Sequence, residues 1–224
     1  MQRRFDNHFS LQASYVWSKV IGYNPVVNQY DVASSRGVLP IDVRHVFAVS
    51  YIYVTPTVHR FSFVGKQVLS GWQLNGITRL QSGSPLNITS GVDTNLDGTN
   101  NDRPNYTGAP VYLSGGRSRA ERALRYFNTA AFAPLNVNSA AVSPYGNVGF
   151  DSVVGPKFVN TDLSAFKTFP IYEQMKLQFR AEVFNVFNNV NMNNPNGVRN
   201  AAAFGSISDS KPPRIVQFAL RLSF

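Results

Sequence analysis

The chain has 224 residues, a formal net charge of +9 and no cysteine, which excludes disulfide bridges, thiolate zinc sites and cysteine nucleophiles. Its hydrophobic content of 43% excludes a disordered chain, while its 15% of charged residues is below the roughly 25% of an average soluble domain. The lysines and arginines are spread along the chain, so we expect no nucleic-acid partner.

Six segments of alternating polarity predict long amphipathic β-strands. Successive side chains of a strand point to opposite faces, so each segment has one apolar and one polar face. Most reach the about 9–11 residues of a transmembrane strand, whereas soluble strands average about 5–6. In chain order the segments are Asn7–Lys19, Val43–Thr55, Gly71–Gln81, Thr161–Thr168, Gln174–Phe187 and Val216–Phe224.

The connections between these segments alternate in length. Three are long, namely Val20–Asp42, Ser82–Asn160 and Asn188–Pro213. The connections between them are the intermediate Pro56–Ser70 and the short Phe169–Glu173. Outer-membrane barrels have short periplasmic turns and longer extracellular loops. The fold class we predict is therefore all-β, an antiparallel transmembrane β-barrel fragment with long extracellular loops.

The longest loop contains two stretches with a local signature. Arg117–Phe127 has loosely helical apolar spacing and predicts one short loop helix. The stretch "DTNLDGTNND" places Asp93, Asn95 and Asp97 at alternating positions before a glycine, as in the first half of a calcium loop, and Asp102 could add a carboxylate. The alternative is an Asn/Asp/Gly-rich loop shaped by side-chain-to-backbone turns, with no cofactor.

The last two strands carry further candidate residues. Lys176, Arg180 and Glu182 share the polar face of one strand, which predicts that they face a wet barrel lumen. On the closing strand the apolar residues alternate up to an aromatic terminus. We expect this pattern to be the insertion signal for the barrel-assembly machinery, and its residues are Phe218, Leu220, Leu222 and Phe224.

Six strands are too few to close a barrel, since the smallest single-chain barrels have about eight. An open sheet edge in hydrocarbon leaves backbone groups unsatisfied. We therefore expect residues 1–224 to be the C-terminal segment of a barrel domain, with Arg3–Asp6 as a periplasmic turn from an earlier strand. The alternative is that several chains pool their strands.

An ordered set of segments resembles one known family, the TonB-dependent outer-membrane transporters of the Oar-like type that carry a carboxypeptidase-regulatory-like domain. The segments cover nearly the whole chain: "LQASYVWSK" (11–19), "DVRHVFAVSYIY" (42–53), "GWQLNGITRLQSGSP" (71–85), "DTNLDGTNNDRPN" (93–105), "YFNTAAFA" (126–133), "GNVGFDSVVGPKFVNTDLSAFKTF" (146–169), "FRAEVFNVFNNVN" (179–191) and "RIVQFALRLSF" (214–224).

The resemblance implies a location in the outer membrane of a Gram-negative bacterium and a barrel of about 22 strands filled by a plug. It implies outer-membrane lipid, the plug of the same full-length chain and the TonB complex as partners. The chain would supply barrel wall, outer loops and insertion signal for uptake of an unknown nutrient, such as a siderophore, cobalamin, carbohydrate or peptide. The alternatives are a passive pore or surface anchor built from several chains, and a soluble β-rich binding protein. We do not expect the chain to be an enzyme, because the sequence shows no set of nucleophile, general base and orienting group.

Overall fold

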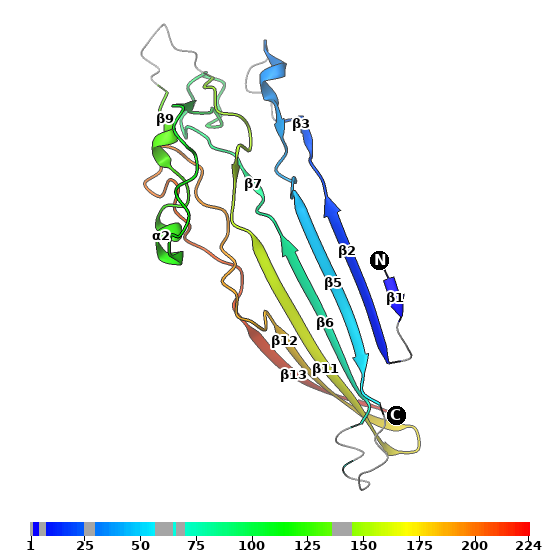
Figure 1. Cartoon of the computed structure of the whole chain (residues 1–224). Coiled ribbons are helices and arrows are strands. Elements are labelled where there is room, and N and C mark those ends of the chain that lie inside the picture. Colours follow the sequence, from blue (N-terminus) through cyan, green and yellow to red (C-terminus); the bar gives the residue numbers. More distant parts are fainter. Residues whose placement is uncertain (1, 5–7, 25–29, 57–64, 66–69, 136–144) are drawn as a thin grey trace.

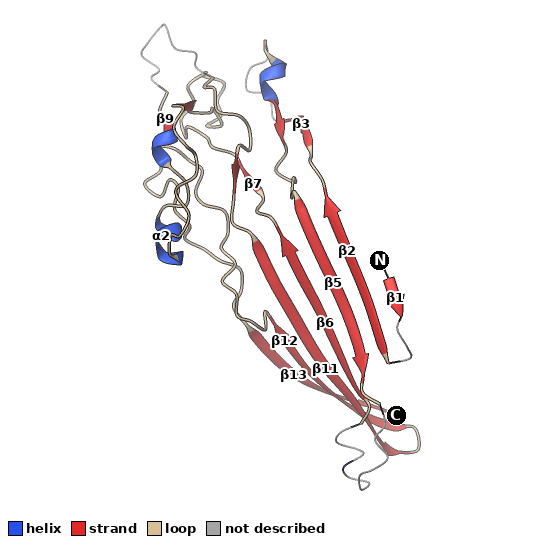
Figure 2. Ribbon diagram, in the orientation of Figure 1, coloured by secondary structure: helices blue, strands red, loops and turns tan. Residues whose placement is uncertain are grey.

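The computed structural model of the chain describes residues 2–4, 8–24, 30–56, 65, 70–135 and 145–224. The described part consists of one antiparallel sheet with a body of loops at one end (Figure 1). Along most of the sheet, neither face is covered by a second layer of strands or helices within those ranges (Figure 2). The sheet therefore has two surfaces instead of a core of its own.

The main sheet follows the chain order, and each strand is antiparallel to its neighbours. Six of its strands are long and confirm the six predicted segments. A short strand, β1, precedes them and pairs with the first long strand. The strands are β1 (Gln2–Arg4), β2 (Phe9–Trp17), β5 (His45–Val54), β6 (Trp72–Gln81), β11 (Phe158–Tyr172), β12 (Met175–Phe184) and β13 (Ile215–Ser223).

The pairing register brings most of the large apolar residues of the six long strands to one face. One row of directly opposed residues crosses the six long strands and is apolar at each of them. This row consists of Phe9, Tyr53, Leu74, Ala165, Ala181 and Phe218. Because side chains alternate along a strand, the period-2 pattern of the sequence segments becomes one largely apolar surface. Thr78, Thr161 and the buried Lys167 are polar residues on the same face.

Two predicted boundaries around β11 were wrong. The strand runs from Phe158 to Tyr172, well beyond the predicted Thr161–Thr168. Its first residues pair with the end of β6, and Pro170 is accommodated next to an irregularity in the pairing with β12. The turn to β12 is accordingly shorter than predicted and consists of Glu173 and Gln174, with Glu173 in the left-handed region at φ 42°.

The predicted turn at Arg3–Asp6 was also wrong, because Arg3 and Arg4 belong to β1 and pair with Leu11 and Ser10. The remaining positions of that prediction lie outside the described residues. The loop helix exists but is shorter than the predicted 117–127. It is α2 (Arg119–Leu124), which begins at a capping box of Ser118 and Glu121.

The long connections all leave the same end of the sheet and carry the short elements of the fold (Figure 1). The first of these connections holds a hairpin and a 3-10 turn, and the second holds most of the others. The elements are β3 (Ile21–Tyr23), η1 (Val32–Ser35), β4 (Arg36–Val38), β7 (Pro85–Leu86), β8 (Asn105–Tyr106), η2 (Thr129–Ala131), β9 (Phe132–Ala133) and β10 (Val153–Val154), together with α2.

A small hydrophobic core lies among these loops. The connections from β6 to β11 and from β12 to β13 join into one loop body through backbone hydrogen bonds, such as Tyr126 N to Gly205 O at 2.7 Å and Arg199 N to Thr89 O at 2.8 Å. Three of its aromatic rings meet edge to face, with centroids 5.1–6.0 Å apart. The buried hydrophobic residues of the described chain all lie here: Ile88, Phe127, Ala131, Phe132, Val148, Phe150 and Val153.

Two buried charged residues hold the loop body together. Asp102 is fully buried, and its Oδ2 accepts hydrogen bonds from Thr94 N at 2.6 Å, Thr94 Oγ1 at 2.8 Å and Asn95 N at 3.0 Å. The next residue, Arg103, donates from Nη1 to Val148 O at 2.8 Å and stacks 4.2 Å from the centre of the Phe150 ring. Burial lowers the pKa of Arg103, and the neighbouring Asp102 carboxylate opposes that shift.

The loop body is joined to the end of the sheet by a close backbone approach. Gly155 N donates to Ser84 O at 2.9 Å, just before β11 and just after β6. A Cβ atom on Gly83 would overlap the carbonyl oxygen of Gly155, so only glycine fits at this crossing.

We predict that Gly83→Ala destabilises the attachment of the loop body by about 1–3 kcal/mol, because backbone must move to admit a methyl group. The measurement is protease cleavage of the loop body, which should become faster. Gly115→Ala is the matched control, since nothing lies within 4 Å of the added Cβ there. Equal cleavage of both variants would show that the close approach of Gly83 to Gly155 does not hold the loop body to the sheet.

We predict that Asp102→Ala loosens the loop around residues 93–103. The substitution leaves buried N–H and O–H donors without an acceptor, and each such donor costs about 1–3 kcal/mol. Amide hydrogen exchange of Thr94 and Asn95 should become faster. Asn100→Ala in the same loop is the control, because the Asn100 side chain is exposed and forms no hydrogen bond with the described residues. Unchanged protection of these two amides in the Asp102 variant would show that the carboxylate does not order the loop.

Candidate functional site

The apolar face of the sheet is the largest candidate functional surface. Large apolar side chains on it are exposed along the whole sheet, including Tyr15, Leu74, Phe218 and Leu220, of which the last two are each 70% exposed. Large contiguous apolar patches mark contact with lipid or protein. Aromatic residues such as Trp17 lie at the strand ends, where amphipathic rings of membrane barrels meet the interface.

The opposite face of the sheet is polar and its side chains bond to one another. Gln73 Nε2 donates to Asn75 Oδ1 at 2.9 Å, and Asn75 Nδ2 donates to Ser164 Oγ at 3.3 Å, which links β6 to β11. Groups on this face retain hydrogen-bond partners without a surrounding core, as the inner wall of a barrel requires.

The three charged residues singled out on β12 lie on this polar face. Their cross-strand partners on β13 are Ser223 for Lys176, Ala219 for Arg180 and Gln217 for Glu182. Gln217 Nε2 donates to Glu182 Oε2, and the Arg180 guanidinium lies 4.7 Å from the centre of the Phe166 ring. Glu182 and Arg180 are thus each held by a neighbouring strand, while Lys176 is exposed.

The proposed insertion signal lies on the last strand of the sheet. Phe218, Leu220 and Leu222 alternate on β13 and point to the apolar face, where the Phe218 ring stacks on Phe179 with centroids 6.2 Å apart. Every residue of β13 is exposed, and Phe224 follows the strand at 94% exposure. The signal residues are therefore accessible at an edge of the sheet.

The calcium-like loop has its three alternating residues close together. Asp93 accepts hydrogen bonds from Asp97 N at 3.1 Å and Gly98 N at 2.8 Å, and Asn95 Nδ2 donates to Asp97 Oδ2 at 3.0 Å. Gly98 has φ 88°, which the turn requires. Hydrogen bonds from the Thr99 side chain, the Asn95 side chain and the Thr99 backbone hold the pKa of Asp97 below its usual value.

Asp102, the fourth predicted ligand, is directed into the loop body. Its Oδ2 is occupied by the Thr94 and Asn95 donors, while its Oδ1 is buried without a hydrogen-bond partner among the described residues. Within the described ranges, no three His, Cys, Asp or Glu side chains form a group suited to a metal ion. The calcium site stays a prediction from the sequence.

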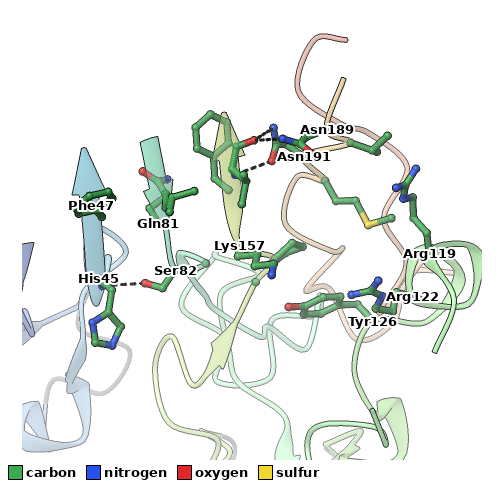
Figure 3. A pocket seen from close by; sticks show the side chains of 18 of the residues that line it. His45, Phe47, Gln81, Ser82, Arg119, Arg122, Tyr126, Lys157, Asn189 and Asn191 are labelled. Carbon is green, nitrogen blue, oxygen red and sulfur yellow. Dashed lines mark hydrogen bonds between the residues drawn. The ribbon is translucent and has the colours of Figure 1, made fainter. Parts of the chain in front are cut away.

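A pocket that the sequence did not reveal lies where the loop body meets the apolar face, and we name it the rim pocket (Figure 3). Its volume is about 1120 Å³. Tyr15, Phe47, Leu80 and Val159 line it and stand directly opposite one another on four neighbouring strands. They form a floor that belongs to the apolar face.

The opposite wall of the rim pocket comes from the loop body. Arg119 and Arg122 of α2, together with Tyr126 and Lys157, line this wall (Figure 3). Burial, and to a lesser degree Tyr112, raise the pKa of Tyr126 to about 12, so its hydroxyl keeps its proton at physiological pH. The pocket combines an apolar floor with a cationic wall.

The sequence contained part of the signal for this pocket. The Arg117 to Arg125 group is among the tightest clusters of cations in the chain, and the helix around it was predicted. Its approach to Tyr15 and Phe47 depends on tertiary contacts between residues that lie far apart in the sequence. No local pattern could have shown it.

No helix among the described residues has the length and apolar character needed to cross a membrane. The sequence matches, over residues 1–217, the model of the family described as "Outer membrane beta barrel domain". Searches of curated proteins and of solved structures find no match. The matched region covers five of the six long strands and the first three residues of β13. The chain belongs to the outer membrane beta barrel domain family, which places it in the outer membrane.

Proposed function

We propose that the chain forms barrel wall and outer loops of a TonB-dependent active transporter. The observation that carries the proposal is the location of buried apolar residues. They lie in the loop body, whereas the long strands expose a face on which most side chains are apolar. Such a face is stable when lipid covers it, and the ordered resemblance to Oar-like transporters supplies the transporter class.

The soluble alternative requires the apolar faces to pack into one core. A sandwich brings two sheets together at about 10 Å, with interdigitating inner faces. The described residues instead place the six long strands side by side in one layer (Figure 2). The soluble interpretation therefore receives no support from this arrangement.

The polar face supports the proposed lumen. In the proposal it faces the plug of the same full-length chain, and Lys176, Arg180 and Glu182 are available to contact that plug or the passing nutrient. The TonB complex acts on the plug from the periplasmic side. The chain contributes wall, loops and insertion signal, and we propose no catalytic step.

A passive pore or surface anchor assembled from several chains is the second candidate. It is favoured by the open sheet, in which β1 and β13 are the end strands of the described part. Exposed strand edges are unstable in hydrocarbon, because their backbone N–H and C=O groups lack hydrogen-bond partners there. Further strands must therefore pair with these edges. A longer chain or neighbouring copies could supply these strands.

We predict that the full-length protein, reconstituted in planar lipid bilayers, shows no steady conductance, because a plug fills the lumen. In cells, its loss and the loss of TonB should each reduce uptake of the same nutrient to background. A panel of siderophores, cobalamin, oligosaccharides and peptides would identify that nutrient.

The matched control is a passive porin in the same bilayers and cells. A steady open conductance, uptake that persists without TonB, or heat-modifiable migration as an oligomer of short chains would contradict the transporter and favour the pore.

We predict that deletion of Phe224 lowers the amount of full-length protein in the outer-membrane fraction, because the terminal ring lies exposed for recognition. The measurement is immunoblotting of separated membranes. Phe224→Tyr is the control that keeps an aromatic ring and should retain insertion. Wild-type levels after the deletion would refute the role of Phe224.

A further inference from the structure

We propose that the rim pocket binds a phosphorylated lipid of the outer leaflet, with its phosphate at Arg119, Arg122 and Lys157 and an acyl chain along the apolar face. This inference goes beyond transport, since it assigns a separate lipid site at the boundary between the barrel wall and its outer loops.

The first support is the floor of the pocket. Tyr15, Phe47, Leu80 and Val159 form one cross-strand row at the loop end of the sheet, on the face that carries the apolar residues of all six long strands. The pocket is therefore continuous with the surface that contacts lipid. The next row of the same face contains Thr78 and Thr161, whose hydroxyl groups bond to each other at 3.1 Å, so an acyl chain can pass over it to the pocket.

The second support is the charge of the wall. Arg119 and Arg122 are three residues apart on α2, which places them on the same side of the helix. Lys157 reaches the pocket from the segment before β11. The lining includes no Asp or Glu, and none of these three side chains forms an ion pair or a hydrogen bond with the described residues. Their positive charge is uncompensated.

The remaining polar lining residues show which groups are free to bind an anion. The Asn191 side chain accepts a hydrogen bond from Val159 N and donates one to Val159 O, each at 2.9 Å. These two bonds fix the pocket wall. Tyr126 keeps its proton and can donate a hydrogen bond beside the cations. At the floor, Tyr15 Oη and His45 Nδ1 are 2.8 Å apart, so this ring pair is already satisfied. We assign anion binding to the two arginines and the lysine, which carry positive charge, with Tyr126 as a donor beside them.

A lipid fits this pocket better than a soluble anion. Free phosphate would use the cations but leave the apolar floor exposed to water. A phosphorylated lipid covers both parts, because its headgroup and chain are joined. The pocket also lies at the end of the sheet that carries the long loops, which are extracellular in outer-membrane barrels.

The test is native mass spectrometry of the full-length protein, purified from the outer membrane in detergent and titrated with bisphosphorylated lipid A. Replacement of Arg119, Arg122 and Lys157 by Gln should weaken binding at least about tenfold, since it removes charge-assisted hydrogen bonds. The matched control replaces the exposed cations Lys19, Arg36 and Lys211 by Gln, which changes net charge equally outside the pocket.

Two further arms separate lipid from free anion. Lipid A without phosphate should bind more weakly than the bisphosphorylated form, and inorganic phosphate should fail to displace the lipid at equal concentration. Phe47→Ala should weaken lipid A binding without changing phosphate binding. Equal losses in the pocket and control variants, or full displacement by inorganic phosphate, would overturn the proposal. Heat-modifiable migration of every variant verifies that the barrel has folded.

Discussion

The constraint on which the structure depends is the apolar face of a one-layer sheet. Six long strands bring their apolar residues to the same side, and no other layer of the described chain covers that side. Burying such side chains is worth about 25 cal/mol per Å², so exposure to water would be costly over a surface of this size. A bilayer removes the cost, and the family match places the chain in that setting.

The same constraint explains why the ordinary features of a soluble protein gather in the loops. Hydrophobic residues cannot form a core inside a single sheet, so the buried ones collect around Phe127, Phe132 and Val153 in the loop body. The loop body also contains buried charges, such as Asp102, whose carboxylate accepts hydrogen bonds from the Thr94 and Asn95 amides. The loop body is packed like a small soluble domain and is joined to the sheet near Gly83 and Gly155.

The boundary between the sheet and the loop body combines apolar and cationic side chains. On the sheet side it is apolar, and on the α2 side it is cationic, with Arg119 and Arg122 above the Phe47 and Leu80 row. An apolar surface in lipid needs only to exclude water, while the loops above it face charged headgroups. The rim pocket lies where the two conditions meet, which is why an amphipathic ligand suits it.

The sequence by itself determined the six strands, their two faces and the alternation of loop lengths. These features are local, since a strand repeats every two residues and its polarity can be read from any short segment. The sequence also located the loop helix. It showed that Lys176, Arg180 and Glu182 share one face of their strand. It missed the full length of β11, whose first residues have little alternation and depend on pairing with β6.

Only the tertiary structure decided how the loops pack. It placed one carboxylate oxygen of Asp102 on the amides of its own loop, buried Phe127 in a core, and brought Arg122 to the end of the apolar face. Each of these outcomes depends on pairs of segments that meet in space. Irregular loops have no repeating period, so their contacts follow from the packing of the whole loop body and not from any local pattern.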